Sequence, residues 1–254
     1  MKAFPKSFIV AALAAWLAGC VQLVPARAEP RPSQAEAESA WASVLERFVD
    51  DEGRVDYRAL ASKRADLDTY VAWIYANAPS HSASRQEVLA YHLNAYNALA
   101  MYNVLETGVP RSLSEYGLLR FFWLRRVRVG GDARSLHSYE NDVIRPLGEE
   151  RVHFALNCMA AGCPRLPRRP FRAATLDPDL EREARRFLNE PRNVQADPTR
   201  RVVRLSEIFK FYSEDFLAKE PSLIAYVNRY RTKPIPSDYR VEFIPYDWTV
   251  AIRP

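Results

Sequence analysis

The longest helical pattern in the chain runs from Ser84 to Leu105, and it determines the centre of the fold. Apolar side chains recur there at helical spacing over a wide arc, and Gly108-Val109-Pro110 ends the pattern. A helix that is apolar over most of its circumference has to be buried. Asn94 and Asn97 lie three residues apart on one side of it, and buried amides need hydrogen-bond partners. The sequence therefore predicts a central helix that carries polar contacts.

Shorter patterns on both sides of this helix indicate an α+β domain. The sequence predicts helices over 40–49, 60–76, 136–147 and 176–189, and another that opens at 206–209. It predicts a hairpin over 126–134 around a Gly-Gly pair, a β-like run at 152–156, and strands at 201–205 and 241–252. We expect one helix-rich α+β domain with a small, mostly antiparallel sheet.

The N-terminus has the layout of a secretory signal peptide. Two lysines, Lys2 and Lys6, precede the apolar run Phe8–Leu17. Ten residues are too few to span the ~30 Å hydrocarbon core of a bilayer. The following Leu17-Ala18-Gly19-Cys20 matches the bacterial lipobox, in which Cys20 becomes the lipidated first residue of the mature protein. A competing site for ordinary signal peptidase is Ala26-Arg27-Ala28.

These signals divide the chain and place it outside the cytoplasm. We expect a signal peptide over 1–19, a Pro- and Ala-containing tether over 20–38, and the domain over 39–254. A lipid on Cys20 would attach the protein to a membrane, and Val21 after it favours outer-membrane sorting, with the domain facing the periplasm. Cleavage after Ala28 would instead release a soluble periplasmic or secreted protein.

Composition excludes several classes of protein. The chain has 254 residues, of which 48% are hydrophobic and 26% are charged, so it is an ordinary globular protein. It holds 8 glycines and none of the Gly-rich phosphate-binding motifs. The formal charge of +5 is modest. We therefore expect no nucleotide cofactor and no nucleic-acid partner.

The segment around two cysteines resembles a known family. Residues 153–164 read HFALNCMAAGCP, which is similar to the hallmark of the domain-of-unknown-function 547 family. Further stretches that resemble this family occur in the same order, namely Val55-Asp56-Tyr57, the run YHLNAYNA at 91–98, Ser135-Leu136 with Tyr139-Glu140, LSEIFKFY at 205–212 with Asp215-Phe216, and Tyr246-Asp247-Trp248. The family often has a histidine where this chain has Asn141. The resemblance implies a compact domain found in bacterial envelope proteins, with no settled biochemical activity.

Two interpretations of the cysteines lead to different functions. In the first, Cys158 and Cys163 form a disulfide, because they are the only cysteines of the mature domain and the compartment is oxidising. The domain would then be a disulfide-stapled binding module for an envelope protein or a small ligand, with no cofactor.

In the alternative interpretation, Cys158 is the nucleophile of a thiol-dependent hydrolase or acyltransferase. His153 is the nearest base in the sequence, but strict strand alternation would place it on the opposite face from Cys158. His92 or His137 would otherwise supply the base, with Glu140 orienting it. Asn94, Asn97 or Asn157 would stabilise an oxyanion.

Two further alternatives use the same residues. His153, Cys158 and Cys163 provide three possible metal ligands, although no C-x-x-C pair is present. A redox shuttle that uses Cys158 and Cys163 is the other alternative, although their C-x4-C spacing is wider than the usual C-x-x-C spacing.

Overall fold

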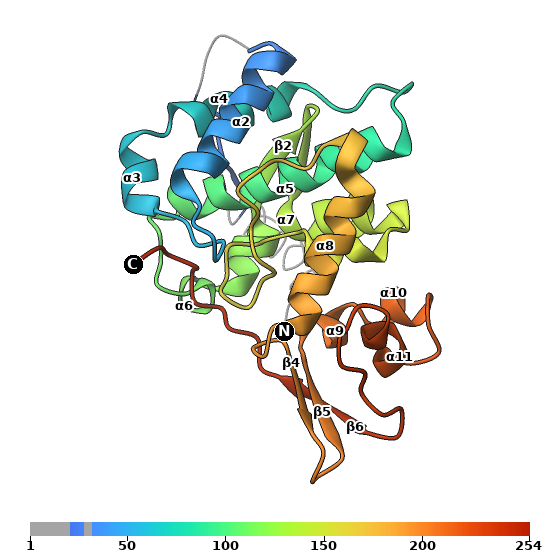
Figure 1. Cartoon of the computed structure of the whole chain (residues 1–254). Coiled ribbons are helices and arrows are strands. Elements are labelled where there is room, and N and C mark those ends of the chain that lie inside the picture. The colour runs from blue at the N-terminus through green and yellow to red at the C-terminus, as the bar shows by residue number, and fades with distance from the viewer. Residues whose placement is uncertain (1–20, 28–31) are drawn as a thin grey trace, which may run out of the picture.

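The structure is a computed structural model, which describes residues 21–27 and 32–254 (Figure 1). The predicted signal peptide, Cys20 and Ala28 lie outside the described residues. Helices and two small sheets form an α+β domain, as the sequence predicts. Within the described part, no helix is both long and apolar enough to cross a membrane.

The structure defines the following element boundaries. The α-helices are α2 (Gln34–Phe48), α3 (Tyr57–Ser62), α4 (Ala65–Ala76), α5 (Arg85–Glu106), α6 (Leu113–Tyr116), α7 (Leu136–Tyr139), α8 (Leu176–Asn189), α9 (Ile208–Phe211), α10 (Ser213–Leu217) and α11 (Leu223–Asn228). Short π and 3-10 turns are η1 (Arg120–Leu124), η2 (Glu140–Ile144), η3 (Arg145–Leu147), η4 (Glu150–Phe154) and η5 (Ala173–Thr175). The strands are β1 (Gln22–Leu23), β2 (Arg125–Val129), β3 (Asp132–Ser135), β4 (Val194–Asp197), β5 (Val202–Ser206) and β6 (Arg240–Ile244).

Helix α5 crosses the middle of the molecule, as its apolar circumference predicts (Figure 1). Ser84 and Glu87 form a capping box at its start, so the helix begins where the sequence pattern begins. From Leu89 to Leu105 almost every side chain is buried. The predicted helix over 60–76 is instead interrupted at Lys63 and Arg64, between α3 and α4.

The strands form two separate three-stranded mixed sheets. In Figure 1, β4, β5 and β6 lie together at the bottom of the view, away from β2. Strand β2 pairs in parallel with β1 and antiparallel with β3. Gly130 and Gly131 both have positive φ in the β2–β3 turn, which confirms the predicted hairpin. In the second sheet, β5 pairs antiparallel with β4 and in parallel with β6. Half of the strand pairings are therefore parallel, whereas the sequence predicts one mostly antiparallel sheet.

The region predicted to be a tether is partly ordered against the domain. Strand β1 adds to β2, and Val24 is buried. Tyr75 and Tyr102 donate their hydroxyls to the carbonyls of Val24 and Pro25, at 2.6 and 2.8 Å. Helix α2 begins at Gln34, earlier than the expected start of the domain at residue 39. The described residues 21–27 therefore belong to the fold.

The run at 152–156 is not a strand. Its first residues form the 3-10 turn η4, where the Glu149 carboxylate accepts the backbone N–H of Arg151. A five-residue apolar run fits a strand or a helical turn equally well, so only the tertiary context decides. Because these residues do not form a strand, strand alternation does not place His153 and Cys158 on opposite faces.

Two hydrophobic clusters meet at the cysteine segment. The larger cluster surrounds α5 and contains both cysteines. The smaller one joins Phe154 to side chains of α8, β5 and α9–α11. Tyr246 packs against both clusters, so the segment from η4 to Cys163 lies at the seam between them.

Candidate functional site

Cys158 and Cys163 lie at the ends of a tight turn, and both are buried free thiols. Their Sγ atoms are 3.0 Å apart, which is hydrogen-bond contact and not a disulfide. The C-terminal tail fixes this turn, because the N–H groups of Ala161 and Gly162 donate to the carbonyls of Thr249 and Asp247. A Cβ on Gly162 would lie 2.9 Å from the Asp247 nitrogen, so only glycine allows this close approach. The predicted disulfide is thus not formed here, although the two sulfurs are in contact.

Hydrogen-bond donors converge on Cys163 rather than on Cys158. The Cys163 sulfur accepts from the Cys158 backbone N–H at 3.1 Å and from the Tyr246 hydroxyl at 3.0 Å. Burial raises the pKa of Cys163, but donation from the Cys158 thiol, Tyr246 and backbone N–H groups outweighs it and lowers this pKa below its ordinary value. The hydrogen bond to Cys163, followed by burial, raises the pKa of Cys158 well above its ordinary value. Of the two thiols, that of Cys163 is therefore the one that ionises first.

Both thiols line a pocket of about 390 Å³ whose walls are mainly aromatic and aliphatic. Side chains from both hydrophobic clusters and from η1 contribute to it. Its apolar lining consists of Leu118, Phe122, Trp123, Leu156, Pro164, Ile208, Phe211 and Trp248, together with the rings of Tyr96, Tyr212 and Tyr246. Its polar lining consists of His137, Glu140, Asn141 and His153. A pocket of this size and chemistry suits a small molecule with an apolar body.

His153 faces a carboxylate and not a thiol. Its Nε2 donates to Oδ2 of Asp215 at 2.8 Å, and Arg145 binds the same carboxylate through two nitrogens at 2.8 and 2.9 Å. Donation from His153, and then from Arg145, holds the pKa of Asp215 well below its usual range despite partial burial. The ring of Tyr212 stacks on His153 with centroids 3.8 Å apart. Within the described chain, His153 makes no hydrogen bond to Cys158, so the expected nucleophile–base pair is not assembled.

The other predicted bases are also remote from the sulfurs or otherwise engaged. His92 shares a hydrogen bond of 2.8 Å with the Tyr139 hydroxyl, and burial lowers its pKa to about 4. His137 stacks on Trp123, with ring centroids 4.4 Å apart, at the pocket wall. Glu140 accepts the Tyr96 hydroxyl at 3.1 Å and also lines the pocket.

The predicted oxyanion donors hold loops together. Asn94 accepts the Phe171 backbone N–H at 3.0 Å and donates to the Phe171 carbonyl at 2.8 Å. Asn97 donates to the Ala155 carbonyl and accepts the Asn157 backbone N–H. The Asn157 amide in turn donates to the Pro164 carbonyl at 2.7 Å. These amides are satisfied by the backbone around the cysteine turn.

Sequence reasoning did not single out three residues of the site, Tyr212, Asp215 and Tyr246. The only signal for them was their position in stretches that resemble the family. No group of three metal-ligating side chains occurs among the described residues, and the metal interpretation has no further support there.

Fold and site together define a helix-rich α+β domain with a buried dithiol pair in the wall of an aromatic pocket. Residues 80–188 match the model of a family described as "Protein of unknown function, DUF547". The matched stretch begins just before α5, includes the cysteine turn and ends within α8, so this part of the chain is similar to that family. No curated protein and no solved structure matches the chain.

Proposed function

We propose that this domain is a ligand-binding module whose site is the pocket over Cys158 and Cys163. The observation that carries the proposal is the pocket itself: about 390 Å³, mainly apolar walls, and two buried sulfurs in one wall. Its ligand would be a small molecule, or the side chain of an envelope protein, with an aromatic or aliphatic body. Glu140, Asn141 and His137 supply the polar groups that would orient such a ligand.

The disulfide belongs to the same proposal. In an oxidising envelope, the contacting thiols of Cys158 and Cys163 would form an S–S bond. The two protons and two electrons would pass to an oxidant disulfide of that compartment, which would be reduced to two thiols as the bond between Cys158 and Cys163 forms. A bond between residues only five apart would fix the cysteine turn, and with it one wall of the pocket, rather than join distant elements.

A thiol-dependent hydrolase or acyltransferase is the second candidate, and one observation favours it. The lowered pKa of Cys163 is typical of a reactive cysteine. The geometry favours Cys163 over the expected Cys158 as the thiolate. The candidate still lacks a base in contact with the sulfur: Nε2 of His153 binds Asp215, and its Nδ1 is buried without a hydrogen-bond partner and bonds neither thiol. This is why we rank binding above catalysis.

Probe binding tests the proposed pocket. The apolar fluorophore 8-anilinonaphthalene-1-sulfonate should bind the folded protein, and Phe211→Ala should weaken its binding by several-fold, because Phe211 lines the pocket and is accessible. Leu217→Ala is the matched control, since Leu217 is similarly exposed but lies outside the pocket. Equal losses in both variants, or none in either, would overturn the proposed site.

Thiol trapping in intact cells, followed by peptide mapping, separates the two candidates. A quantitative bond between Cys158 and Cys163 supports the stapled binding module and excludes a free nucleophile. Free thiols, with fast alkylation of Cys163, would support the thiol enzyme and contradict the staple.

We also propose that the protein is an envelope lipoprotein attached through Cys20. The signal-like N-terminus and the lipobox support this proposal. The ordered contacts of residues 21–27 support it further, because cleavage after Ala28 would remove β1 and buried Val24 from the fold. Cleavage of the signal peptide before Cys20 would leave β1 and Val24 in the mature protein.

A further inference from the structure

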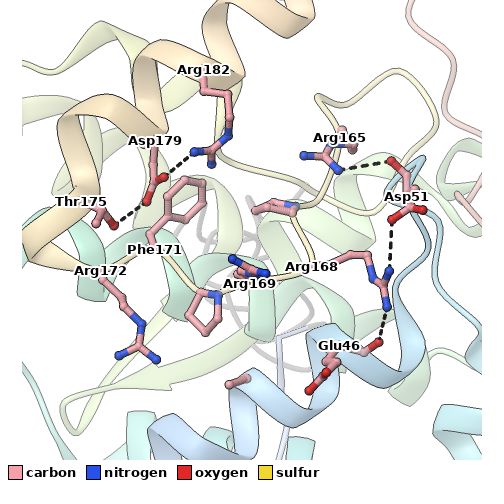
Figure 2. Close-up of a pocket in the computed structure, with 13 residues that line it drawn as sticks. Glu46, Asp51, Arg165, Arg168, Arg169, Phe171, Arg172, Thr175, Asp179 and Arg182 are labelled. Carbon is pink, nitrogen blue, oxygen red and sulfur yellow. Dashed lines mark hydrogen bonds and ion pairs between the residues drawn. The ribbon is translucent and has the colours of Figure 1, made fainter.

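A second cleft, of about 840 Å³, lies between α2 and the start of α8 and is lined by arginines (Figure 2). One wall is α2 with the turn after it, and the other is the start of α8. The loop over 165–172 runs between them. Its charged lining comprises Arg165, Arg168, Arg169, Arg172 and Arg182 with Glu46, Asp51 and Asp179. Five guanidinium groups thus face three carboxylates, which leaves the cleft with excess positive charge.

The loop that carries most of these arginines is held rigidly at both ends. Asn157 binds the Pro164 carbonyl where the loop begins, and Asn94 binds both backbone groups of Phe171 where it ends. Leu166 and Phe171 are buried, so they fix the loop to the core. Pro167 and Pro170 restrict the backbone between these points. The arginine side chains therefore extend from a preorganised backbone.

Two of the arginines are not neutralised by the protein. Arg168 pairs with Asp51 at 3.1 Å, and Arg182 pairs with Asp179. Arg169 and Arg172 make no side-chain hydrogen bond or ion pair with any residue in 21–27 or 32–254, and Figure 2 shows neither joined to another side chain. Both are exposed to solvent, where an anion can reach them.

Arg165 adds to this excess charge from a more buried position. Its Nε is buried without a hydrogen-bond partner, and its contact with Glu183 is long, at 3.5 Å. Burial lowers the pKa of Arg165, and the neighbouring Arg186 and Arg182 lower it further against the attraction of Glu183. Like-charge crowding of this kind is relieved when an anion binds.

We propose that this cleft binds a ligand that carries two or more phosphate groups. Guanidinium groups recognise phosphate through paired N–H donors, and several of them on one rigid loop can bind neighbouring phosphates together. The cleft volume of about 840 Å³ falls within the usual range for a small ligand. This site is separate from the aromatic pocket, and the two share only the loop that follows Cys163.

Inorganic tripolyphosphate is the probe that tests the proposal. By titration calorimetry at low ionic strength, the wild-type protein should bind it, and Arg169→Gln with Arg172→Gln should weaken binding about 10-fold or more. The matched control is Arg200→Gln with Arg204→Gln, which removes the same charge from exposed positions outside the cleft. The control should change the affinity less than about 2-fold. No binding by the wild type, or equal losses in both double variants, would overturn the proposal.

Vesicles distinguish the two sources of such phosphates. The chain that begins at Val21, which carries no lipid, is the form to test. A lipid headgroup is identified if this chain cosediments with cardiolipin vesicles but not with phosphatidylcholine vesicles, and if the Arg169/Arg172 variant does not. Tripolyphosphate binding without vesicle binding would identify a free phosphate compound. Either result supports the cleft, and failure of both probes contradicts it without affecting the aromatic pocket.

Discussion

At the residue scale, one hydroxyl distinguishes the two thiols. Tyr246 donates to Cys163 at 3.0 Å and lies farther, at 3.6 Å, from Cys158. Glu207 fixes this tyrosine by accepting its backbone N–H at 2.8 Å. The preference for a thiolate on Cys163 thus depends on a residue more than eighty positions away in the sequence.

Removing the Tyr246 hydroxyl should slow the alkylation of Cys163. In the reduced protein, Tyr246→Phe removes a donor to the thiolate, so the pKa of Cys163 rises and its alkylation near pH 7 falls several-fold. The measurement is the rate of iodoacetamide labelling of Cys163 across pH 6 to 10, resolved by peptide mapping. The midpoint of the profile should move to higher pH.

Tyr239→Phe is the control for this profile, because Tyr239 lies outside the pocket. If Tyr246→Phe and the wild type give the same midpoint, the assignment of the thiolate to Cys163 is wrong.

At the element scale, the sequence predicted those elements whose signals are local. Helix α5 has its capping box and its period, helix α8 has an acidic first turn, and the β2–β3 hairpin has its two glycines. The run at 152–156 carries no such signal, and it became the turn η4 because Phe154 packs into the second cluster. The sequence also singled out the cysteine turn, and the structure places both cysteines in the wall of the aromatic pocket.

The partners of that turn could not be read from the sequence in the same way. His153 hydrogen-bonds to Asp215, which lies sixty-two residues later in the sequence. Arg145 binds the same carboxylate and lies seventy residues before it. Nothing in the spacing of these residues indicates contact, because α10 is brought to η4 by the packing of the second cluster. The hypothesis that His153 serves as the base for Cys158 was based on their closeness in the sequence. In the folded chain, His153 instead hydrogen-bonds to Asp215.

The segment before α2 permits a prediction at this scale. A chain that begins at Glu29 lacks β1, the buried Val24 side chain and the two tyrosine hydrogen bonds to its backbone. Compared with a chain that begins at Val21, its free energy of unfolding should fall by about 3 kcal/mol. Urea denaturation followed by tryptophan fluorescence measures this difference.

Two single substitutions refine that comparison. Val24→Ala should account for part of the loss, whereas Leu23→Ala should be nearly neutral, because Leu23 is 44% exposed and Val24 only 1%. Equal stability of the two chain lengths would show that residues 21–27 do not contribute to the fold.

At the scale of the whole molecule, the domain carries two dissimilar sites. The aromatic pocket lies at the seam of the two hydrophobic clusters, and the arginine cleft lies between α2 and α8. One continuous segment links them, since the cysteine turn ends at Cys163 and the arginine loop begins at Arg165. Asn157 contacts both parts, because its side chain binds the Pro164 carbonyl and accepts the Met159 N–H.

The proposed anchor gives a prediction at this scale. Expressed from its full sequence, the protein should fractionate with membranes, and Cys20→Ala should move it to the soluble envelope fraction. Cys163→Ala is the control for loss of a cysteine as such, and it should leave the membrane fraction unchanged. Membrane association that persists in Cys20→Ala would contradict the lipid anchor.

The docking of β1 limits how far an anchored domain could travel. Only Val21 separates Cys20 from the first strand, and that strand is tied to β2. An acylated Cys20 would therefore have almost no slack, and the domain would be confined to the headgroup layer with few orientations open to it. Such a protein would sample ligands and partners that arrive at the bilayer surface, and it would have no reach across the periplasmic space.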